Sequence, residues 1–511
     1  MCYFKKLKKG DDVLNTFKER SNYLKAIALM SIFTFVFLGI EYLFVDMISL
    51  LVSENRVVLS QNYVLGMSCL GFGLYPLYNR YFKGLSRKIC IVISVAIIGL
   101  ITIIYLHPTY PLTLITGLVL FLFLGGLGGV TSYKALCILP DQKYLARCVG
   151  LSYMIGILLQ FINNNFISVS LIESIALDIF MCLLMFVLTT VPNTLKHHLD
   201  VSMVKKERQI CGGLLILLVF MMSCVFSTLD NAVTLLHATG EVNVEELPRI
   251  LLALSGFVGG IIFDLKERRF MSMIMYCVMV LSTICIVVLK YSELYLIGLI
   301  VFYMTAGFFV VFFTTSFMEI SMYMKFPDLW AGLGRGVNNL AAMLLTKGSL
   351  FFINSQEDLT AIILAICLFF FVSIITFTYV IQRKKLIEKL SESQKTLLTK
   401  ENKILKIKEH YAFTPRESEV FEYLISTEDS VQDIANNMYV SKRTLERYIS
   451  AIYKKTGVKS RVGLLNIYNK DRNFDYFTRN NSFVIIQNGK KYFLNDYIEQ
   501  IFELFDKKAI P

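Results

Sequence analysis

A cluster of basic side chains near the C-terminus has the composition that binding to nucleic acid requires. Between residues 442 and 461 the chain carries seven Lys or Arg residues and one acid, Glu446. Such a cluster neutralises phosphates, which supply much of the affinity of a protein for DNA. Arginine can also read guanine through two parallel hydrogen bonds, and we expect Arg447 to do so. The predicted contacts to double-stranded DNA are Lys442, Arg443, Thr444, Arg447, Tyr448, Lys454, Lys455 and Arg461.

Local capping signals predict the helices that would position this cluster. Thr414 stands three residues before Glu417, which is the pattern of a capping box at the start of a helix. A second helix is predicted over about 430–437 and a third over about 442–455, preceded by Ser441 as its cap. The buried stripe of the third helix comprises Leu445, Ile449 and Ile452.

The segment from 413 to 461 resembles the LuxR-type helix-turn-helix, a bacterial DNA-binding domain of four helices. Two positions depart from the family: Glu446 stands where a DNA-contacting lysine is usual, and Tyr448 replaces a common histidine. The resemblance implies that the third helix enters the major groove. The residues that carry it are Thr414, Pro415, Arg416, Glu417, Glu419, Val420, Ile434, Ala435, Val440, Ser441, Thr444, Leu445, Gly457, Val458, Ser460 and Arg461.

The rest of the chain has the composition of a membrane protein. Hydrophobic residues make up 55% of the sequence and charged residues 18%, far from the balance of soluble domains. Apolar stretches of about 20 residues, long enough to cross a bilayer, recur up to Val380 and then stop. We therefore predict an all-α bundle of twelve spans, at 27–45, 62–79, 89–106, 112–133, 149–166, 172–191, 211–229, 248–263, 271–289, 292–317, 331–352 and 359–381.

The distribution of basic residues predicts the orientation of these spans. Loops and tails on one side carry 26 Lys or Arg and those on the other carry 4, and the rich side faces the cytoplasm. Arg335 belongs to the rich side in this count and Arg249 to the poor side. Both termini are therefore expected in the cytoplasm of a bacterium, with the protein in its inner membrane. No cleavable signal peptide is evident, because more spans follow the first apolar run.

An internal repeat indicates that the spans form two related halves. The segment 140–150 begins Pro-Asp and continues to an Arg and a Gly, and 327–336 does the same six spans later. A duplication of six spans predicts parallel halves about an axis along the membrane normal.

Residues 20–382 resemble a major facilitator superfamily transporter. The loop after the eighth span is similar to the signature of that family, in which charge pairing is thought to gate the rocking of the halves. Asn79 stands where the first half should carry the acid. Alternatively, either loop is an ordinary basic cytoplasmic turn. The resemblance assigns the gating loop to Gly259, Asp264, Arg268 and Arg269.

Charges inside the spans are candidates for a ligand site, because a charge at the bilayer centre costs at least about 2.5 kcal/mol. Glu41 and Asp230 belong to the first helices of the two halves, and the resemblance to a facilitator fold implies that these helices line a central cavity. Lys347 could pair with Glu41, or its side chain could extend to the outer surface. The reading favoured for Asp230 alone is a solvated side chain at the interface, and Glu319 is expected at the cytoplasmic interface.

The segment 383–410 is predicted to be a charged helix, either single or dimeric. Leu390, Leu397 and Ile404 recur at seven-residue spacing, with Leu386 and Ile407 at companion positions, so a homodimer through a short coiled coil is one reading. Beyond it we predict a hairpin around Asn488-Gly489 and a helix over about 495–507. The predicted domains are 1–26, 27–382, 383–410, 411–470 and 471–511.

These patterns together predict a membrane-integral transcriptional regulator whose membrane domain responds to a small ligand. The alternatives are a secondary transporter with a regulatory or vestigial DNA-binding module, and a tether that responds to no ligand. The five His residues offer no metal-ligand spacing, and no nucleotide-binding glycine loop or nucleophile elbow is present. We therefore predict no enzymatic activity, no metal and no cofactor.

Overall fold

The computed structural model divides the chain into two compact units, Met1–Leu390 and Ser391–Pro511. It describes helices and turns up to residue 469 and three strands after it. The described residues are 2–82, 86–106, 109–139, 142–167, 169–191, 205–238, 247–291, 295–354, 358–469, 475–479, 482–487 and 490–493.

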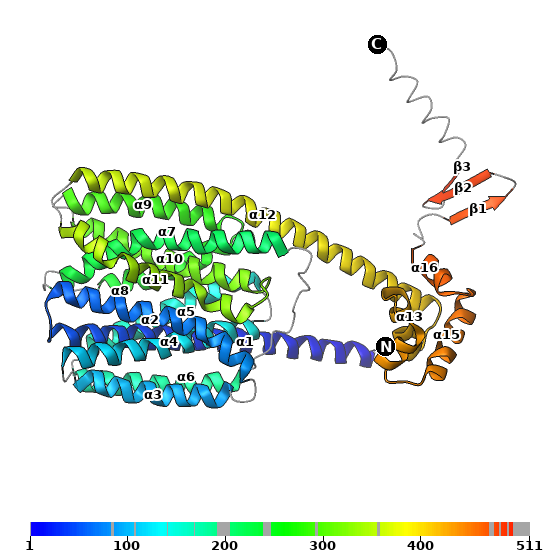
Figure 1. Ribbon diagram of the computed structural model, residues 1–511, viewed down its shortest axis with the longest axis horizontal. Coiled ribbons are helices and arrows are strands. Elements are labelled where there is room, and N and C mark those ends of the chain that lie inside the picture. The colour runs from blue at the N-terminus through cyan, green and yellow to red at the C-terminus, as the bar shows by residue number, and fades with distance from the viewer. Residues whose placement is uncertain are drawn as a thin grey trace, which may run out of the picture. The chain divides into compact units, whose positions relative to one another are not determined.

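The first unit is a bundle of long helices (Figure 1). Each of the predicted spans falls on one of them. They are α1 (Cys2–Ser49), α2 (Glu54–Tyr81), α3 (Ser86–Leu106), α4 (Tyr110–Ile138), α5 (Leu145–Phe166), α6 (Ser170–Thr190), α7 (Lys205–Ala238), α8 (Leu247–Phe263), α9 (Met271–Tyr291), α10 (Tyr295–Ser321), α11 (Pro327–Asn354) and α12 (Asp358–His410), with a 3-10 turn, η1 (Gln142–Tyr144), before α5.

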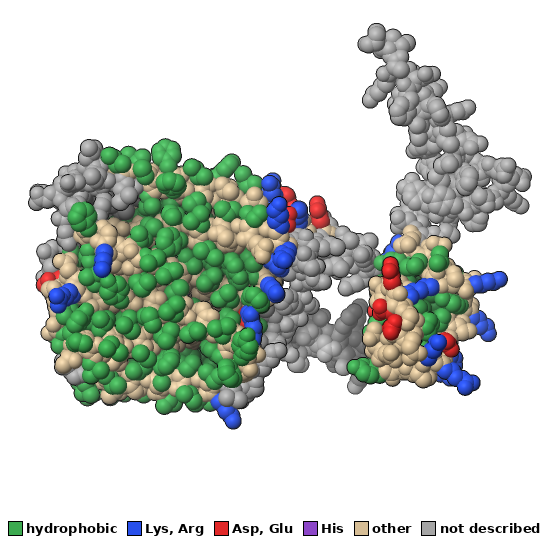
Figure 2. Space-filling model, viewed as in Figure 1, with side chains coloured by type: hydrophobic (Ala, Val, Ile, Leu, Met, Phe, Trp, Pro, Cys, Tyr) green, Lys and Arg blue, Asp and Glu red, His purple; other side chains and the backbone are tan. Residues whose placement is uncertain are grey.

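The surface of this bundle is suited to a bilayer. Within the described residues nine helices are long and apolar enough to cross a membrane, and α8 and α9 contribute shorter apolar stretches. Hydrophobic side chains cover most of the face of the bundle seen in Figure 2, and the Lys and Arg side chains in that view lie mainly at one end. The first unit is therefore a multi-pass membrane domain, whereas the number of twelve spans stays a prediction.

The two halves of the bundle meet along two helix pairs that the internal repeat relates to each other. Helix α2 packs on α11, and α5 packs on α8, which is the equivalent pair six helices apart. In the second pair the backbones approach so closely that a Cβ atom on Gly150 would lie 2.6 Å from the carbonyl oxygen of Gly256. Small residues permit such contacts between membrane helices. The helices α3 and α6 lie at one edge of the bundle, and α9 and α12 lie at the other (Figure 1).

Within its described residues, the second unit contains the end of α12, four short helices and a small sheet. Its core combines residues of all four helices with Ile407 from the end of α12. The strands form an antiparallel sheet in the order β1-β2-β3, so a third strand precedes the hairpin that Asn488-Gly489 predicted. The helix predicted over 495–507 lies outside the described residues. The elements are α13 (Pro415–Ser426), α14 (Val431–Asn437), α15 (Lys442–Thr456), α16 (Arg461–Asn469), β1 (Asp475–Arg479), β2 (Ser482–Gln487) and β3 (Lys490–Phe493).

The residues of the predicted coiled-coil seam are already packed within the chain. Leu386 and Leu390 are buried in the core of the first unit. Ile407 is buried in the core of the second unit, and Ile404 packs against that core. The side chain of Leu397 is outside the described residues. A dimer through this seam would have to remove these side chains from their own cores, and both the coiled coil and the single helix stay predictions.

Candidate functional site

Side-chain caps fix the starts of the three helices that form the helix-turn-helix. Thr414 and Glu417 make a complete capping box: the Thr414 amide donates to Glu417 Oε2 at 2.7 Å, and the Glu417 amide donates to Thr414 Oγ1 at 3.3 Å. Ser430 caps α14 and Ser441 caps α15 in the same way, through the amides three residues on. These local hydrogen bonds orient α15 on the core.

Helix α15 divides into a buried and an exposed face. Leu445 and Ile452 are fully buried, since neither has measurable exposure. Arg443, Arg447 and Lys454 lie on the opposite face and are exposed, and Lys442 is exposed at its start. Thr444 is half-buried, with its hydroxyl 2.8 Å from the Ser441 hydroxyl, and Tyr448 is half-buried against the core. An exposed basic helix face of this kind can meet phosphates and base edges in a major groove.

Two residues predicted to contact DNA have internal partners. The Lys455 ammonium donates to Glu417 Oε2 at 2.7 Å and to the Ala412 carbonyl at 2.9 Å. The Arg461 guanidinium donates to the carbonyls of Leu424 and Asp429, both at 2.7 Å. Both cations therefore stabilise the domain, and their sequence positions among other basic residues could not distinguish this role from contact with phosphate.

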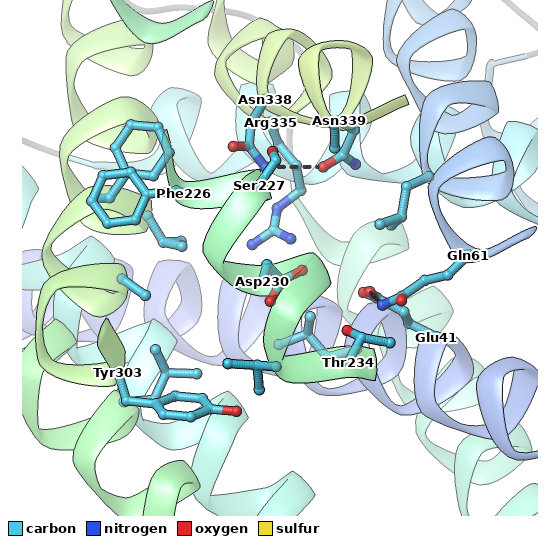
Figure 3. Close-up of a pocket in the computed structure, with 18 of the residues that line it drawn as sticks. Glu41, Gln61, Phe226, Ser227, Asp230, Thr234, Tyr303, Arg335, Asn338 and Asn339 are labelled. Atoms are coloured by element: carbon cyan, nitrogen blue, oxygen red, sulfur yellow. Dashed lines mark hydrogen bonds between the residues drawn. The ribbon is translucent and has the colours of Figure 1, made fainter. Parts of the chain in front are cut away.

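The membrane domain contains a cavity of about 200 Å³ between its two halves. Glu41 and Asp230, which lie on helices expected to border such a cavity, line it (Figure 3). The Gln61 amide donates to Glu41 Oε1 at 2.8 Å. Lys347 does not line the cavity; its side chain is exposed and has no contact with Glu41 in the structure.

The cavity is also lined by two arginines that were treated in the sequence analysis only as loop charges, in the count of Lys and Arg that predicts the orientation of the spans. Arg335 lies within α11, its guanidinium carbon 5.1 Å from the centre of the Phe37 ring. Arg249 lies at the start of α8, over the Tyr42 ring at 4.3 Å. Both fall inside predicted spans, so the cost of a charge in a membrane could have identified them. The other polar side chains of the cavity that the sequence reading missed are Tyr42, Gln61, Tyr153, Ser227, Thr234, Tyr303, Asn338 and Asn339.

The predicted gating loop contacts the other half of the bundle, but the glycine that permits this contact is not the predicted one. Asp264 accepts hydrogen bonds from the backbone amides of Ala146 at 3.1 Å and Arg147 at 2.7 Å, at the start of α5. The glycine that allows this approach is Gly260, because a Cβ there would lie 2.6 Å from the Ala146 carbonyl oxygen. The predicted Gly259 faces Phe308 of α10 instead, and the predicted Arg269 is exposed.

The equivalent contact in the first half has its acid on the opposite helix. Asn79 donates to Asp328 Oδ2 at 3.2 Å, and Arg80 forms an ion pair with Asp328 Oδ1 at 2.6 Å. The acid thus comes from α11 and its donors from α2. This reversed arrangement explains how Asn79 can replace an acid without loss of the contact between the halves.

A buried cluster of charges joins the gating loop to α12. Glu319 of α10 accepts from Arg268 Nε at 3.0 Å and from Arg383 at 2.9 Å. Arg268 also donates to Asp264 Oδ1 at 3.2 Å and to the Gln142 carbonyl at 2.5 Å. These contacts hold a tight turn in which Lys266, Glu267 and Arg268 all have positive φ angles. From the sequence, Glu319 is expected at the cytoplasmic interface of the membrane, and no partner is predicted for its carboxylate.

Comparison with known families agrees with the geometry of the second unit. The model of the GerE family, bacterial regulatory proteins of the luxR family, matches residues 411–467. These residues are a LuxR-type helix-turn-helix domain. No curated protein matches the chain in sequence.

The membrane domain is similar in fold to major facilitator superfamily proteins. The proton:xylose symporter XylE has a TM-score of 0.51 and 15% identity over 73% of this chain and 96% of that protein. The human organic anion transporter MFSD10 (TETRAN) has a TM-score of 0.48 and 10% identity over 71% of this chain and 99% of its own. The likeness to XylE shows the fold of the membrane domain, so the chain is a fusion of a major-facilitator-like membrane fold with a LuxR-type domain.

Substituting Glu446 tests the one acid on the exposed face of α15 in the LuxR-type domain. Glu446→Lys replaces a charge that repels phosphate with one that attracts it. We expect tighter binding to DNA of any sequence, and a slope of log affinity against log salt that is steeper by about 1. Filter binding at several salt concentrations measures both quantities. Glu428→Lys, an equal change in charge at an exposed residue outside α15, should change the slope less; equal slopes would contradict this role of the face.

Acid should weaken the LuxR-type domain through Glu417. Burial opposes ionisation, but hydrogen bonds from Lys455 and Thr414 outweigh it and hold the pKa of the Glu417 carboxyl below its usual range. The carboxylate therefore stabilises the fold above the unfolded pKa, about 4.3, and this stabilisation disappears as pH falls through the folded pKa. Glu417→Gln should cost about 1–2 kcal/mol at pH 7.

Urea unfolding of the fragment 391–511 at several pH values measures this effect. The difference in unfolding free energy between Glu417→Gln and the unchanged fragment should shrink below pH 4. Glu419→Gln, which removes an exposed pair with Arg416, serves as the control and should cost less at every pH. A difference for Glu417→Gln that stays constant down to pH 2 would exclude the ion pair as its cause.

Proposed function

We propose that the protein is a membrane-integral transcriptional regulator that binds promoter DNA through its LuxR-type domain in response to a small ligand in the membrane domain. The observation that carries the proposal is the exposed basic face of α15 in a chain that also holds membrane-length helices. A DNA-binding face can function only in the compartment that contains the chromosome, which in a bacterium is the cytoplasm. Both termini are therefore placed in the cytoplasm and the protein in the bacterial inner membrane, which agrees with the distribution of basic residues.

Within the LuxR-type domain, the proposed DNA contacts divide by chemistry. Arg443 and Arg447 read base edges, because arginine matches the acceptor pattern of guanine. Lys442 and Lys454 contact phosphates and set the register on the duplex. Thr444 and Tyr448 take a smaller part, since both are half-buried.

The ligand is proposed to act through the contacts between the halves. The cavity lies between the two halves, and Asp264 and Asp328 hold the same halves together away from it. A ligand that draws the walls of the cavity together changes the strain on these contacts. Arg383 lies in α12, the helix that leads to the LuxR-type domain, and forms an ion pair with Glu319, which also pairs with Arg268 of the gating loop. A movement of the gating loop would therefore reach α12 through Glu319.

Occupancy of the genome by the tagged, intact protein in its host tests the proposal. We expect sharp peaks that disappear in the Arg443→Ala/Arg447→Ala variant and persist in Arg416→Ala, which removes an exposed arginine from α13. The absence of peaks in every growth condition would overturn the proposal. The alternative, a secondary transporter, is favoured by the fold shared with XylE. It predicts that vesicles holding residues 1–390 concentrate a substrate, whereas a sensor binds without concentrating.

A further inference from the structure

The cavity of the membrane domain carries charges of both signs. Its lining includes two acids, Glu41 and Asp230, and two bases, Arg249 and Arg335. Figure 3 shows Glu41 and Gln61 on one side, Asp230 on the central helix, and Arg335 beside Asn338 and Asn339. A cavity with this lining offers opposite charges to different ends of one small molecule.

Several of these polar groups lack a partner within the part of the chain that the structure describes. Arg335 forms a contact with the Phe37 ring and no ion pair, and Asp230 is exposed to the cavity without a hydrogen bond. Arg249 is 8% exposed and its Nε has no acceptor, while Gln61 is 8% exposed and its Oε1 has no donor. Charges left inside a membrane domain are costly, and a ligand of complementary charge would offset that cost.

The remaining wall is apolar, and part of it is aromatic. Phe226 and Phe309 stack with ring centres 4.3 Å apart, and Phe302, Phe313 and Tyr303 line the same space. Such a surface binds the apolar body of a ligand, whereas the charged groups fix its orientation. A sugar or another neutral polyol would form no ion pair with the arginines and carboxylates of the cavity.

We propose that the cavity binds a small zwitterion with an apolar or aromatic body, of the class to which the amino acids belong. The anionic group binds Arg335, the cationic amine binds Asp230 and Glu41, and the body packs on Phe226 and Phe309. The inference deepens the proposed function, on which it rests for the consequence of binding, since it names the class of ligand that the regulator senses.

Thermal-shift titration of the full chain in detergent tests the inference. The probes are the twenty common amino acids and, for each zwitterion that binds, its amine without the carboxylate and its acid without the amine. For phenylalanine these are phenethylamine and 3-phenylpropionate. At least one amino acid should bind, and about tenfold or more tightly than either of its counterparts, because each lacks one charged contact.

Two variants assign the contacts. Arg335→Gln should weaken the zwitterion about tenfold or more and leave its amine counterpart almost unchanged. Asp230→Asn should weaken the zwitterion and leave its acid counterpart almost unchanged. Lys347→Gln, in the same helix as Arg335 but outside the cavity lining, is the matched control and should bind as the unchanged protein does.

The outcomes separate this inference from the proposed function. No binding by any amino acid, or equal binding of a zwitterion and its two counterparts, overturns the inference even if genomic peaks are found. Zwitterion binding that responds to Arg335→Gln and Asp230→Asn, in a protein without genomic peaks, supports the inference and overturns the regulator.

Discussion

Replacing Arg443 and Arg447 together by alanine should lower the affinity of the protein for its operator by about a hundredfold or more. Each arginine that reads a base contributes about 1–3 kcal/mol of discrimination. The two side chains are exposed on the face of α15 opposite Leu445 and Ile452, so their removal leaves the core of the domain intact. Fluorescence anisotropy with a labelled operator, compared with a scrambled duplex of the same length, measures the change.

The control for this variant is a substitution of one arginine at another exposed position of the same domain. Arg416→Ala removes a side chain that pairs with Glu419 at 2.8 Å on α13. It should reduce binding to the operator and to the scrambled duplex alike, and by less. If the double variant also weakens both duplexes equally, α15 contacts phosphates without reading bases.

Replacing Glu319 by glutamine should destabilise the membrane domain by about 3–5 kcal/mol, the cost of removing one partner from a buried ion pair. Glu319 bridges Arg268 and Arg383, and the three side chains are between 7% and 12% exposed. Glutamine keeps an oxygen acceptor but takes from Arg383 the carboxylate it pairs with among the described residues, and leaves Arg268 with Asp264 alone. The melting temperature of the full chain in detergent should fall by several degrees.

A second carboxylate in the region provides the matched control. Glu388 pairs with Lys384 at 3.8 Å, and its side chain is 59% exposed. Glu388→Gln should change the melting temperature very little, because exposed pairs contribute less than about 1 kcal/mol. Equal effects of the two substitutions would show that the cluster around Glu319 is not a structural core of the membrane domain.

The parts of the fold that depend on local sequence could be predicted. The capping box at Thr414 and Glu417 lies within four consecutive residues, so the sequence could predict it. The sequence could also predict the membrane helices, because their length and apolar composition identify them. The resemblance to a facilitator fold also implied that the first helix of each half lines a central cavity, and Glu41 and Asp230 line the cavity of the structure. The sequence left open whether Asp230 faces that cavity or is solvated at the interface, because one charge does not specify the rotation of its helix.

Contacts between residues far apart in the chain could not be predicted. Arg461 looked like one more cation in a basic run, and its three carbonyl partners lie 32 to 37 residues earlier. Arg335 falls inside a predicted span, so the cost of a charge there could have marked it as a functional residue, but the sequence does not specify which side of its helix faces the cavity. Lys347 showed the opposite error, since pairing with Glu41 required a helix rotation that the sequence does not specify.

Ile407 has a consequence for how such a fusion could be assembled or exchanged between proteins. Its side chain, 4% exposed, completes the core of the LuxR-type domain although it belongs to the same continuous helix that contributes Leu386 and Leu390 to the membrane domain. A recombination point at Tyr411, where the family match begins, would leave the DNA-binding domain with a hole where Ile407 packs. The compatible breakpoint lies between Leu390 and Ile404, so chimaeras that carry this domain to another membrane protein should take the last two turns of α12 with it.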